Sequence, residues 1–317
     1  MNSFFLNQAQ YFTSLNPQDF SKVYVKNSLI GYINEQTLQF LLANYAKDFE
    51  LRTLIVNSSL DSSEDNQKSN QKSEKLDIIP KSPLPAIYLK STYQTFNDIS
   101  NFFDNLLDSL QNYITLGILI KKTNEYLLVK GVTTLENLFK IDRGIAALFG
   151  VISEGIHING YIEKDKKIYM WIAKRAAQVV EAHKYDNMVG GAISYGCCPE
   201  QTVIKESHEE ASIPKHLASS SKQVGKIAYK IYRNNGIRND VIYMYDLKLP
   251  LDYKPTINDQ EVEGFYLLDL QEVYHLLIND KFKYNSGLIV SYFLLRNNAL
   301  NNYESQLLKS LFIKLLI

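Results

Sequence analysis

The chain has 317 residues, of which 45% are hydrophobic and 21% charged, so it can bury a core for one large domain or two modest ones. Lys plus Arg and Asp plus Glu both number 34, and this zero net charge argues against a nucleic-acid partner, which needs a concentrated basic surface. No apolar run approaches the roughly 18 residues that a membrane span requires. The N-terminus lacks the pattern of a signal peptide, and the only cysteines are the adjacent Cys197 and Cys198, so a cytoplasmic location is predicted.

The first 112 residues indicate an N-terminal α+β domain. Residues 22–33 have the pattern of a hairpin, and residues 34–49 and 92–113 have helical spacing. Residues 57–75 are almost wholly polar and lack periodicity, which is typical of a flexible loop. We place the domain boundary near Asn112.

Residues 113–317 alternate between strands and helices. Strand patterns occur at 117–130, 156–162, 167–175 and 240–249, and helices are expected at about 135–149, 200–211 and 270–279, with two more near the C-terminus. The chain therefore belongs to the α/β (α+β) class, with a mixed sheet between helices. The apolar tail at 307–317 is broken by Lys309 and Lys314, and we expect it to pack on the domain as an amphipathic helix rather than bind a membrane.

The most informative stretch is an acidic helix that follows a glycine turn. Glu206, Glu209 and Glu210 stand at positions i, i+3 and i+4, so they share one helix face and repel one another. A bound cation would remove that repulsion, and carboxylate oxygens are ligands that Mg²⁺ prefers. An ordinary solvated helix face is the alternative for these residues taken alone.

The same stretch resembles the Nudix box, G-x5-E-x7-R-E-U-x-E-E-x-G-U, in which U is a bulky aliphatic residue. Gly191 takes the first glycine, Glu206 follows the arginine position, and Glu209 and Glu210 supply the paired acids. The chain departs from the box at Cys197, Lys205, Ser207 and Ser212.

A wider resemblance covers residues from about 124 to 296 and includes the strings HINGY, DNMVGG and KESHEEASIP. It is similar to a Nudix subfamily related to the domain fused to thiamine pyrophosphokinase in some fungi, which carries an extra N-terminal domain. The resemblance implies a Nudix fold in residues 113–317 and hydrolysis of an organic diphosphate to the monophosphate and phosphate. Thiamine diphosphate or its oxidised analogues would be the substrate. Mg²⁺, or Mn²⁺ in its place, would be held by Glu206, Glu209 and Glu210.

Other candidate residues follow from the same resemblance. Glu261 is expected at the site as a base or extra ligand, in preference to Glu263, although a solvated loop end is an equal alternative. The substrate-binding candidates are Gly190, Gly191, Lys174, Arg175 and Lys205, and for the two strand-end cations Lys174 and Arg175 ordinary surface charge is an equal alternative.

Three residues are given structural interpretations. His157 is expected to be a hydrogen-bonded structural residue, and Trp171 a core residue rather than a platform for a substrate ring. Cys197 is interpreted as a small packed residue in preference to a reactive thiol.

Two alternative functions remain open. The four departures from the box leave room for a non-catalytic Nudix-fold module that senses a ligand. Hydrolysis of nucleoside diphosphate derivatives is the other alternative. The expected partner is a small-molecule diphosphate, and the chain is expected to be a monomer or a homodimer.

Overall fold

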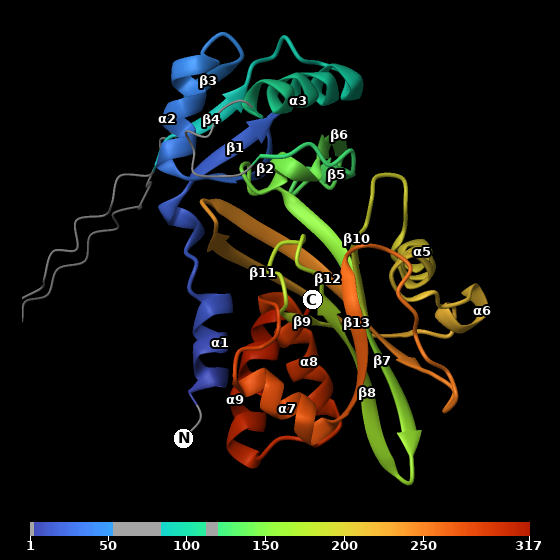
Figure 1. Ribbon diagram of the computed structural model, residues 1–317. Coiled ribbons are helices and arrows are strands. Elements are labelled where there is room, and N and C mark those ends of the chain that lie inside the picture. The colour runs from blue at the N-terminus through green and yellow to red at the C-terminus, as the bar shows by residue number, and fades with distance from the viewer. Residues whose placement is uncertain (1–2, 53–83, 112–119) are drawn as a thin grey trace, which may run out of the picture.

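The computed structural model describes residues 3–52, 84–111 and 120–317 (Figure 1). The predicted polar loop at 57–75 and the boundary near Asn112 lie outside the described residues. Within the described part of the chain, no helix is both long and apolar enough to cross a membrane.

The N-terminal elements form a four-stranded sheet in the order β2-β1-β4-β3 with two helices beside it. The predicted hairpin is confirmed, because β1 pairs with β2 in antiparallel register. The predicted helices are confirmed as well. The elements are η1 Pro17–Asp19, β1 Ser21–Val25, β2 Ser28–Ile33, α2 Glu35–Asn44, β3 Phe49–Arg52, β4 Ala86–Leu89 and α3 Phe96–Leu110.

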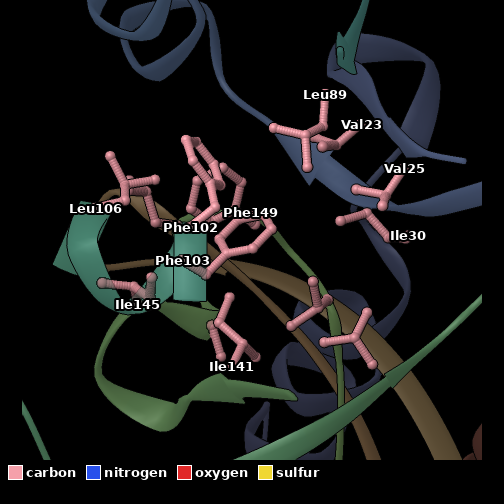
Figure 2. Close-up of a cluster of buried hydrophobic side chains, with 14 of the residues drawn as sticks. Val23, Val25, Ile30, Leu89, Phe102, Phe103, Leu106, Ile141, Ile145 and Phe149 are labelled. Carbon is pink, nitrogen blue, oxygen red and sulfur yellow. The ribbon is translucent and has the colours of Figure 1, made fainter. Parts of the chain in front are cut away.

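One hydrophobic core joins this sheet to residues that lie beyond position 120 (Figure 2). The ring of Phe103 in α3 stacks on Phe139 with 4.5 Å between centroids and meets Phe149 edge-on at 5.1 Å. Ile141 and Ile145 are also buried in this cluster. Residues 120–151 therefore pack with the N-terminal elements rather than with the large sheet that follows them.

The helix predicted at 135–149 is wrong for most of its length. Residues Asn137–Asp142 form strand β6, which pairs with β5 Tyr126–Lys130, and only α4 Arg143–Ala146 is helical. Leu138, Phe139 and Ile141 are almost fully buried, so packing against α3 selects the strand. The Asp142 side chain then accepts the N–H of Gly144 at 2.7 Å and starts the short helix.

The C-terminal half contains a seven-stranded mixed sheet in the order β11-β12-β7-β8-β13, with β10 paired to β7 and β9 paired to β8. All of these pairs are antiparallel except β12 with β7. The strands are β7 Ile152–Lys164, β8 Lys167–Arg175, β9 Tyr185–Asp186, β10 Val189–Ala192, β11 Lys222–Arg233, β12 Gly236–Lys248 and β13 Val262–Asp269.

Helices cover both faces of this sheet, as predicted (Figure 1). On β8, Trp171 faces one apolar cluster, whereas Met170 and Ile172 face another, as the two-residue period of a strand requires. The first cluster includes residues of α5 Pro199–Ala211 and lies beside α6 Lys215–Ala218. The second is built with α1 Phe4–Thr13, α7 Leu270–Ile278, α8 Tyr284–Arg296 and α9 Asn302–Leu315.

Both ends of the described chain pack in the second cluster. Phe5 and Phe12 of α1 are buried there, so the first helix lies on the C-terminal helices and not on the N-terminal sheet. Leu308 and Phe312 of α9 are buried in the same cluster, which confirms that the apolar tail packs on the domain.

Gly31 on β2 provides a test of this packing. A Cβ atom at Gly31 would lie 2.3 Å from the carbonyl oxygen of Phe149, a backbone atom that cannot easily move. We expect Gly31→Ala to lower the free energy of unfolding by about 1–3 kcal/mol, measured by urea denaturation. Gly264→Ala is the control, because its Cβ would meet nothing closer than 3.5 Å. Equal effects of the two substitutions would contradict this account.

Candidate functional site

The acidic helix α5 follows β10 after a loop of six residues. Pro199 is its first residue, and the N–H of Cys198 donates to Gln201 Oε1 at 3.0 Å. In β10, Gly190 pairs with His157 and Gly191 with Ile156 of β7. The sheet and the start of the helix therefore determine together where the acidic face lies.

The two glycines of β10 hold two of the three glutamates. A Cβ atom at Gly191 would lie 2.4 Å from Cδ and 2.7 Å from Oε2 of Glu206, so this carboxylate rests against the bare backbone of the strand. The N–H of Gly190 donates to Glu210 Oε2 at 3.1 Å. Both glycines, predicted to bind substrate, thus contact the acidic helix directly.

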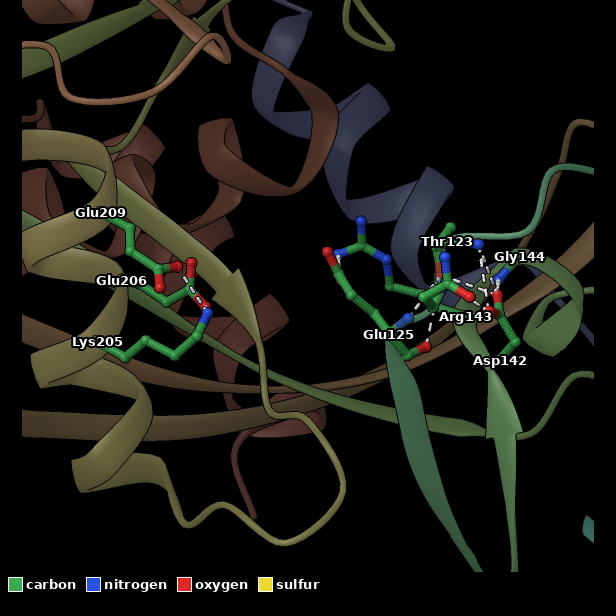
Figure 3. Close-up of polar contacts among 9 residues, drawn as sticks. Thr123, Glu125, Asp142, Arg143, Gly144, Lys205, Glu206 and Glu209 are labelled. Atoms are coloured by element: carbon green, nitrogen blue, oxygen red, sulfur yellow. Dashed lines mark hydrogen bonds and ion pairs between the residues drawn. The ribbon is translucent and has the colours of Figure 1, made fainter.

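The ammonium group of Lys205 lies between the carboxylates of Glu206 and Glu209 (Figure 3). Its Nζ is 2.9 Å from Glu206 Oε1 and 2.7 Å from Glu209 Oε2. The side chain of Glu206 is 15% exposed and that of Glu209 51% exposed. Burial raises the pKa of Glu206, and the Lys205 ammonium opposes that shift. The positive charge of Lys205 thus offsets part of the repulsion between these two acids.

Glu210 lines a very small polar pocket, with a volume of about 10 Å³. Five residues predicted from the sequence meet there, since Lys174, Arg175, Gly190 and Glu261 line the same pocket. Burial raises the pKa of Glu210 well above its usual value, and the nearby acids Asp186 and Glu206 add to the shift. The remaining lining residues are Ala173, Asp186, Asn187 and Val262.

Arg175 is anchored at the wall of this polar pocket. Its Nη1 donates to Asp186 Oδ2 at 2.9 Å, and its Nε donates to the carbonyl of Val180 at 3.0 Å. Burial raises the pKa of the Asp186 carboxyl, but neighbouring charges, led by Lys283, outweigh burial and lower it to about 2. Asp186 is therefore an anion that fixes the guanidinium group.

Sequence reasoning missed Asp186 and Asn187 as site residues. Both are buried, with 8% and 1% exposure; Asp186 ends the short strand β9, and Asn187 follows it before β10. The available signal was an acid and an amide between strands, in a stretch already notable for its glycines. Buried polar residues of this kind need partners, which makes them candidates for a site.

The structure separates the two acids near residue 262. Glu261 lines the polar pocket, whereas Glu263 accepts from Lys174 Nζ at 2.7 Å and lies 3.2 Å from His183 Nδ1. The carbonyl of Glu261 accepts the N–H of Ala176 at 2.9 Å, which ties it to the end of β8. The preference for Glu261 over Glu263 agrees with this placement.

His157 belongs to a buried hydrogen-bond network, as expected for a structural residue. Its Nδ1 lies 2.8 Å from Asn187 Oδ1, and its Nε2 lies 3.3 Å from Asn285 Nδ2. Because Nδ1 faces an amide oxygen and Nε2 faces an amide nitrogen, the neutral ring donates from Nδ1 and accepts at Nε2. Burial lowers the pKa of His157 to about 4. Trp171 is 8% exposed and lies in the core, also as expected.

Two departures from the box have structural consequences. Cys197 and its neighbour Cys198 are exposed free thiols, so the interpretation of Cys197 as a packed residue is wrong. Neither cysteine belongs to one of the apolar clusters. Ser212 ends α5 in the left-handed conformation, at a φ of 53°. The box has glycine at this position, and glycine is the residue that adopts this conformation without strain.

The donor chemistry of the site fits a hard divalent cation. Glu206, Glu209 and Glu210 offer carboxylate oxygens from one helix face, and Glu210 lies close enough to Asp186 and Glu206 for these acids to raise its pKa further. As placed, however, no three His, Cys, Asp or Glu side chains in the described residues stand close enough together to hold a metal ion. Lys205 and a cation would compete for the same two carboxylates.

Comparison with known proteins finds similarity to Nudix hydrolases. No protein-family model matches the chain. Nudix hydrolase 24, chloroplastic, from Arabidopsis thaliana is 34% identical over 186 residues, which cover 58% of this chain and 51% of that protein. Nudix hydrolase 20, chloroplastic, from the same plant is 29% identical over 238 residues, which cover 66% of this chain and 64% of that protein. Over these segments the chain is similar in sequence to both Nudix hydrolases.

A third relative, the uncharacterized protein YJR142W of Saccharomyces cerevisiae, is 35% identical over 172 residues, which cover half of each chain. The chain thus spans between one half and two thirds of the length of these relatives. The names of the two plant relatives place them in the chloroplast. The cytoplasmic location of the present chain stays a prediction.

Ser212 gives a stability test of the C-terminal end of helix α5. We expect Ser212→Gly to raise the free energy of unfolding by about 1 kcal/mol, because glycine adopts the left-handed conformation without the clash that a Cβ causes. The control is Ser219→Gly, since Ser219 ends α6 at a φ of −66° and gains nothing from glycine. Stabilisation by both substitutions, or by neither, in thermal and urea unfolding would contradict the assignment.

His157 gives a pH test. The unfolded chain takes up a proton near pH 6.5, whereas the folded ring resists protonation down to about pH 4. The unfolded state therefore binds more protons in this window, and stability falls as the pH drops from 6.5 to 4, by up to about 3 kcal/mol. His157→Gln should lose less stability than the wild type over the same range. His216→Gln, at an exposed position, should follow the wild type, and urea titrations at several pH values decide between these outcomes.

Proposed function

We propose that this chain is a divalent-metal-dependent hydrolase of an organic diphosphate, with thiamine diphosphate or its oxidised analogues as the substrate and Mg²⁺ or Mn²⁺ as the metal. One observation carries the proposal. The acidic face of α5 meets Gly190 and Gly191 of β10 beside a pocket that also contains Arg175 and Glu261, in a chain related to Nudix hydrolases.

Glu206, Glu209 and Glu210 are the residues that would hold the cation. Such an ion, when bound, neutralises phosphate oxygens and orients the leaving group. The raised pKa values of Glu206 and Glu210 show that both carboxylates lose hydration on burial. A positive partner would favour their ionised forms.

Arg175 is the residue best placed to bind a phosphate oxygen. Two of its nitrogens are occupied by Asp186 and Val180, so the guanidinium keeps a fixed orientation while its remaining N–H groups can donate to an anion. Lys174 lines the same pocket but is paired with Glu263. We therefore assign the stronger phosphate contact to Arg175.

Glu261 is proposed as the group that accepts the proton of the attacking water. The water oxygen forms a bond to phosphorus, the bridging P–O bond breaks, and inorganic phosphate and the organic monophosphate result. The proton of the water passes to a Glu261 carboxylate oxygen and then to solvent, to which this exposed residue has access. The polar pocket is too small to enclose a diphosphate, so the phosphate groups would lie at its mouth and the organic group outside it.

Lys205 supports a second candidate function, a module that binds a ligand without turnover. Its ammonium already offsets part of the negative charge of Glu206 and Glu209, so the site has reduced need of a metal. Phosphate groups could then be bound by Arg175 alone. This candidate predicts binding of a diphosphate without release of phosphate.

A phosphate-release screen tests both candidates. It would include thiamine diphosphate, its oxidised analogues, nucleoside diphosphates and dinucleotides, each with Mg²⁺ or Mn²⁺. We expect monophosphate to appear from a thiamine-type substrate. The rate should fall at least about 100-fold in Glu206→Gln, Glu209→Gln, Glu210→Gln and Glu261→Gln, because each removes a charge from the proposed site.

Glu200→Gln is the matched control, since Glu200 is an exposed acid in the first turn of the same helix. It should retain the wild-type rate. Turnover of nucleotides alone would overturn the thiamine assignment and keep the hydrolase. Tight binding of a diphosphate without turnover under either metal would favour the ligand-binding module.

A further inference from the structure

A second cavity lies on the other side of the sheet, between α1 and the helices α7 and α8, and contains none of the residues of the polar pocket. We propose that this aromatic cavity binds a small, uncharged, flat aromatic molecule that carries a hydrogen-bonding group. The inference does not depend on the proposed hydrolase activity.

The size and lining of the cavity suit such a ligand. It encloses about 410 Å³, which is within the usual range for small-molecule pockets. Aromatic rings come from two parts of the chain, with Phe4, Tyr11 and Phe12 on α1 and Phe282 and Tyr284 at the start of α8. The rings of Phe12 and Tyr284 are near-parallel, with centroids 6.4 Å apart, and form a wall on which a flat molecule can lie.

The charged residues around the cavity are already paired, so the ligand is uncharged. Arg233 donates to Tyr11 Oη at 3.2 Å and forms an ion pair with Glu181. Lys283 Nζ lies 3.5 Å from Asp186 Oδ2. The third charged lining residue, Asp280, accepts from Lys184 Nζ at 3.1 Å. A charged ligand would have to break one of these pairs.

Gln8 supplies the hydrogen-bonding partner. It lines the cavity, and only 8% of the residue is exposed. The carboxamide oxygen of Gln8 lies 3.1 Å from Ser291 Oγ, and this hydroxyl also lies 2.7 Å from the carbonyl oxygen of Gly287. No other described residue bonds to this carboxamide, so its second end is left for a ligand. That end is not among the fully buried polar atoms without a partner, so it is accessible from the cavity and can pair with a ligand.

The test uses 2-quinolone, a flat bicyclic lactam that has both a donor and an acceptor. Ligand-observed NMR titrations should show saturable binding to the full-length wild type, and a crystal soak should place the ring between α1 and α8. Gln8→Leu keeps a side chain of similar size without the amide, and binding should weaken at least about tenfold. Asn7→Trp fills the cavity from an exposed position on α1 and should abolish binding.

Gln10→Trp is the control, because Gln10 is exposed on the same helix and does not line the cavity. It should bind 2-quinolone like the wild type. Thermal unfolding of each variant verifies that α1 remains docked. Lack of saturable binding to the wild type would overturn the proposal, as would unchanged affinity in a folded Asn7→Trp protein. Unchanged affinity in Gln8→Leu would overturn the role of the amide.

Discussion

The close contact between α5 and β10 is the constraint on which the candidate site depends. A Cβ at Gly191 would lie within 2.4 Å of Glu206, and the N–H of Gly190 is bonded to Glu210. Two strand residues without side chains thus let the acidic face approach the backbone, and this approach removes water from both carboxylates. The raised pKa values of the two acids follow from that loss of water. Larger residues in β10 would push the helix outward and leave the three acids hydrated on an ordinary surface.

A second constraint is that every buried charge beside the site needs a partner. Asp186 meets this need by accepting from Arg175 and by approaching Lys283, which comes from the start of α8. The guanidinium of Arg175 is oriented as a result. Lys283 also lines the aromatic cavity, so this side chain links that cavity to Asp186, a lining residue of the polar pocket. The helices on the far face of the sheet therefore help to set the electrostatics of the candidate site.

Segments from each half of the chain pack in the hydrophobic core of the other half. Residues 120–151 bury Phe139 and Phe149 against α3 of the N-terminal part, while α1 buries Phe5 and Phe12 among the C-terminal helices. Such exchange ties the two parts together through apolar contact, which is the main stabilising term in folding. It also explains why the aromatic cavity has walls from residues nearly 280 positions apart in the sequence.

The sequence by itself determined the acidic face, the glycine turn, the hairpin and the amphipathic last helix. These depend on periodicity and local backbone preferences, which neighbouring residues carry. The tertiary structure decided the rest. Stacking on Phe103 made a strand of residues 137–142 where local spacing favoured a helix. The pairing of Arg175 with Asp186, the insertion of Lys205 between two acids and the unfilled amide of Gln8 depend on distances between side chains. Those distances exist only after strands and helices have packed, because hydrophobic burial, and not local sequence, determines which elements meet.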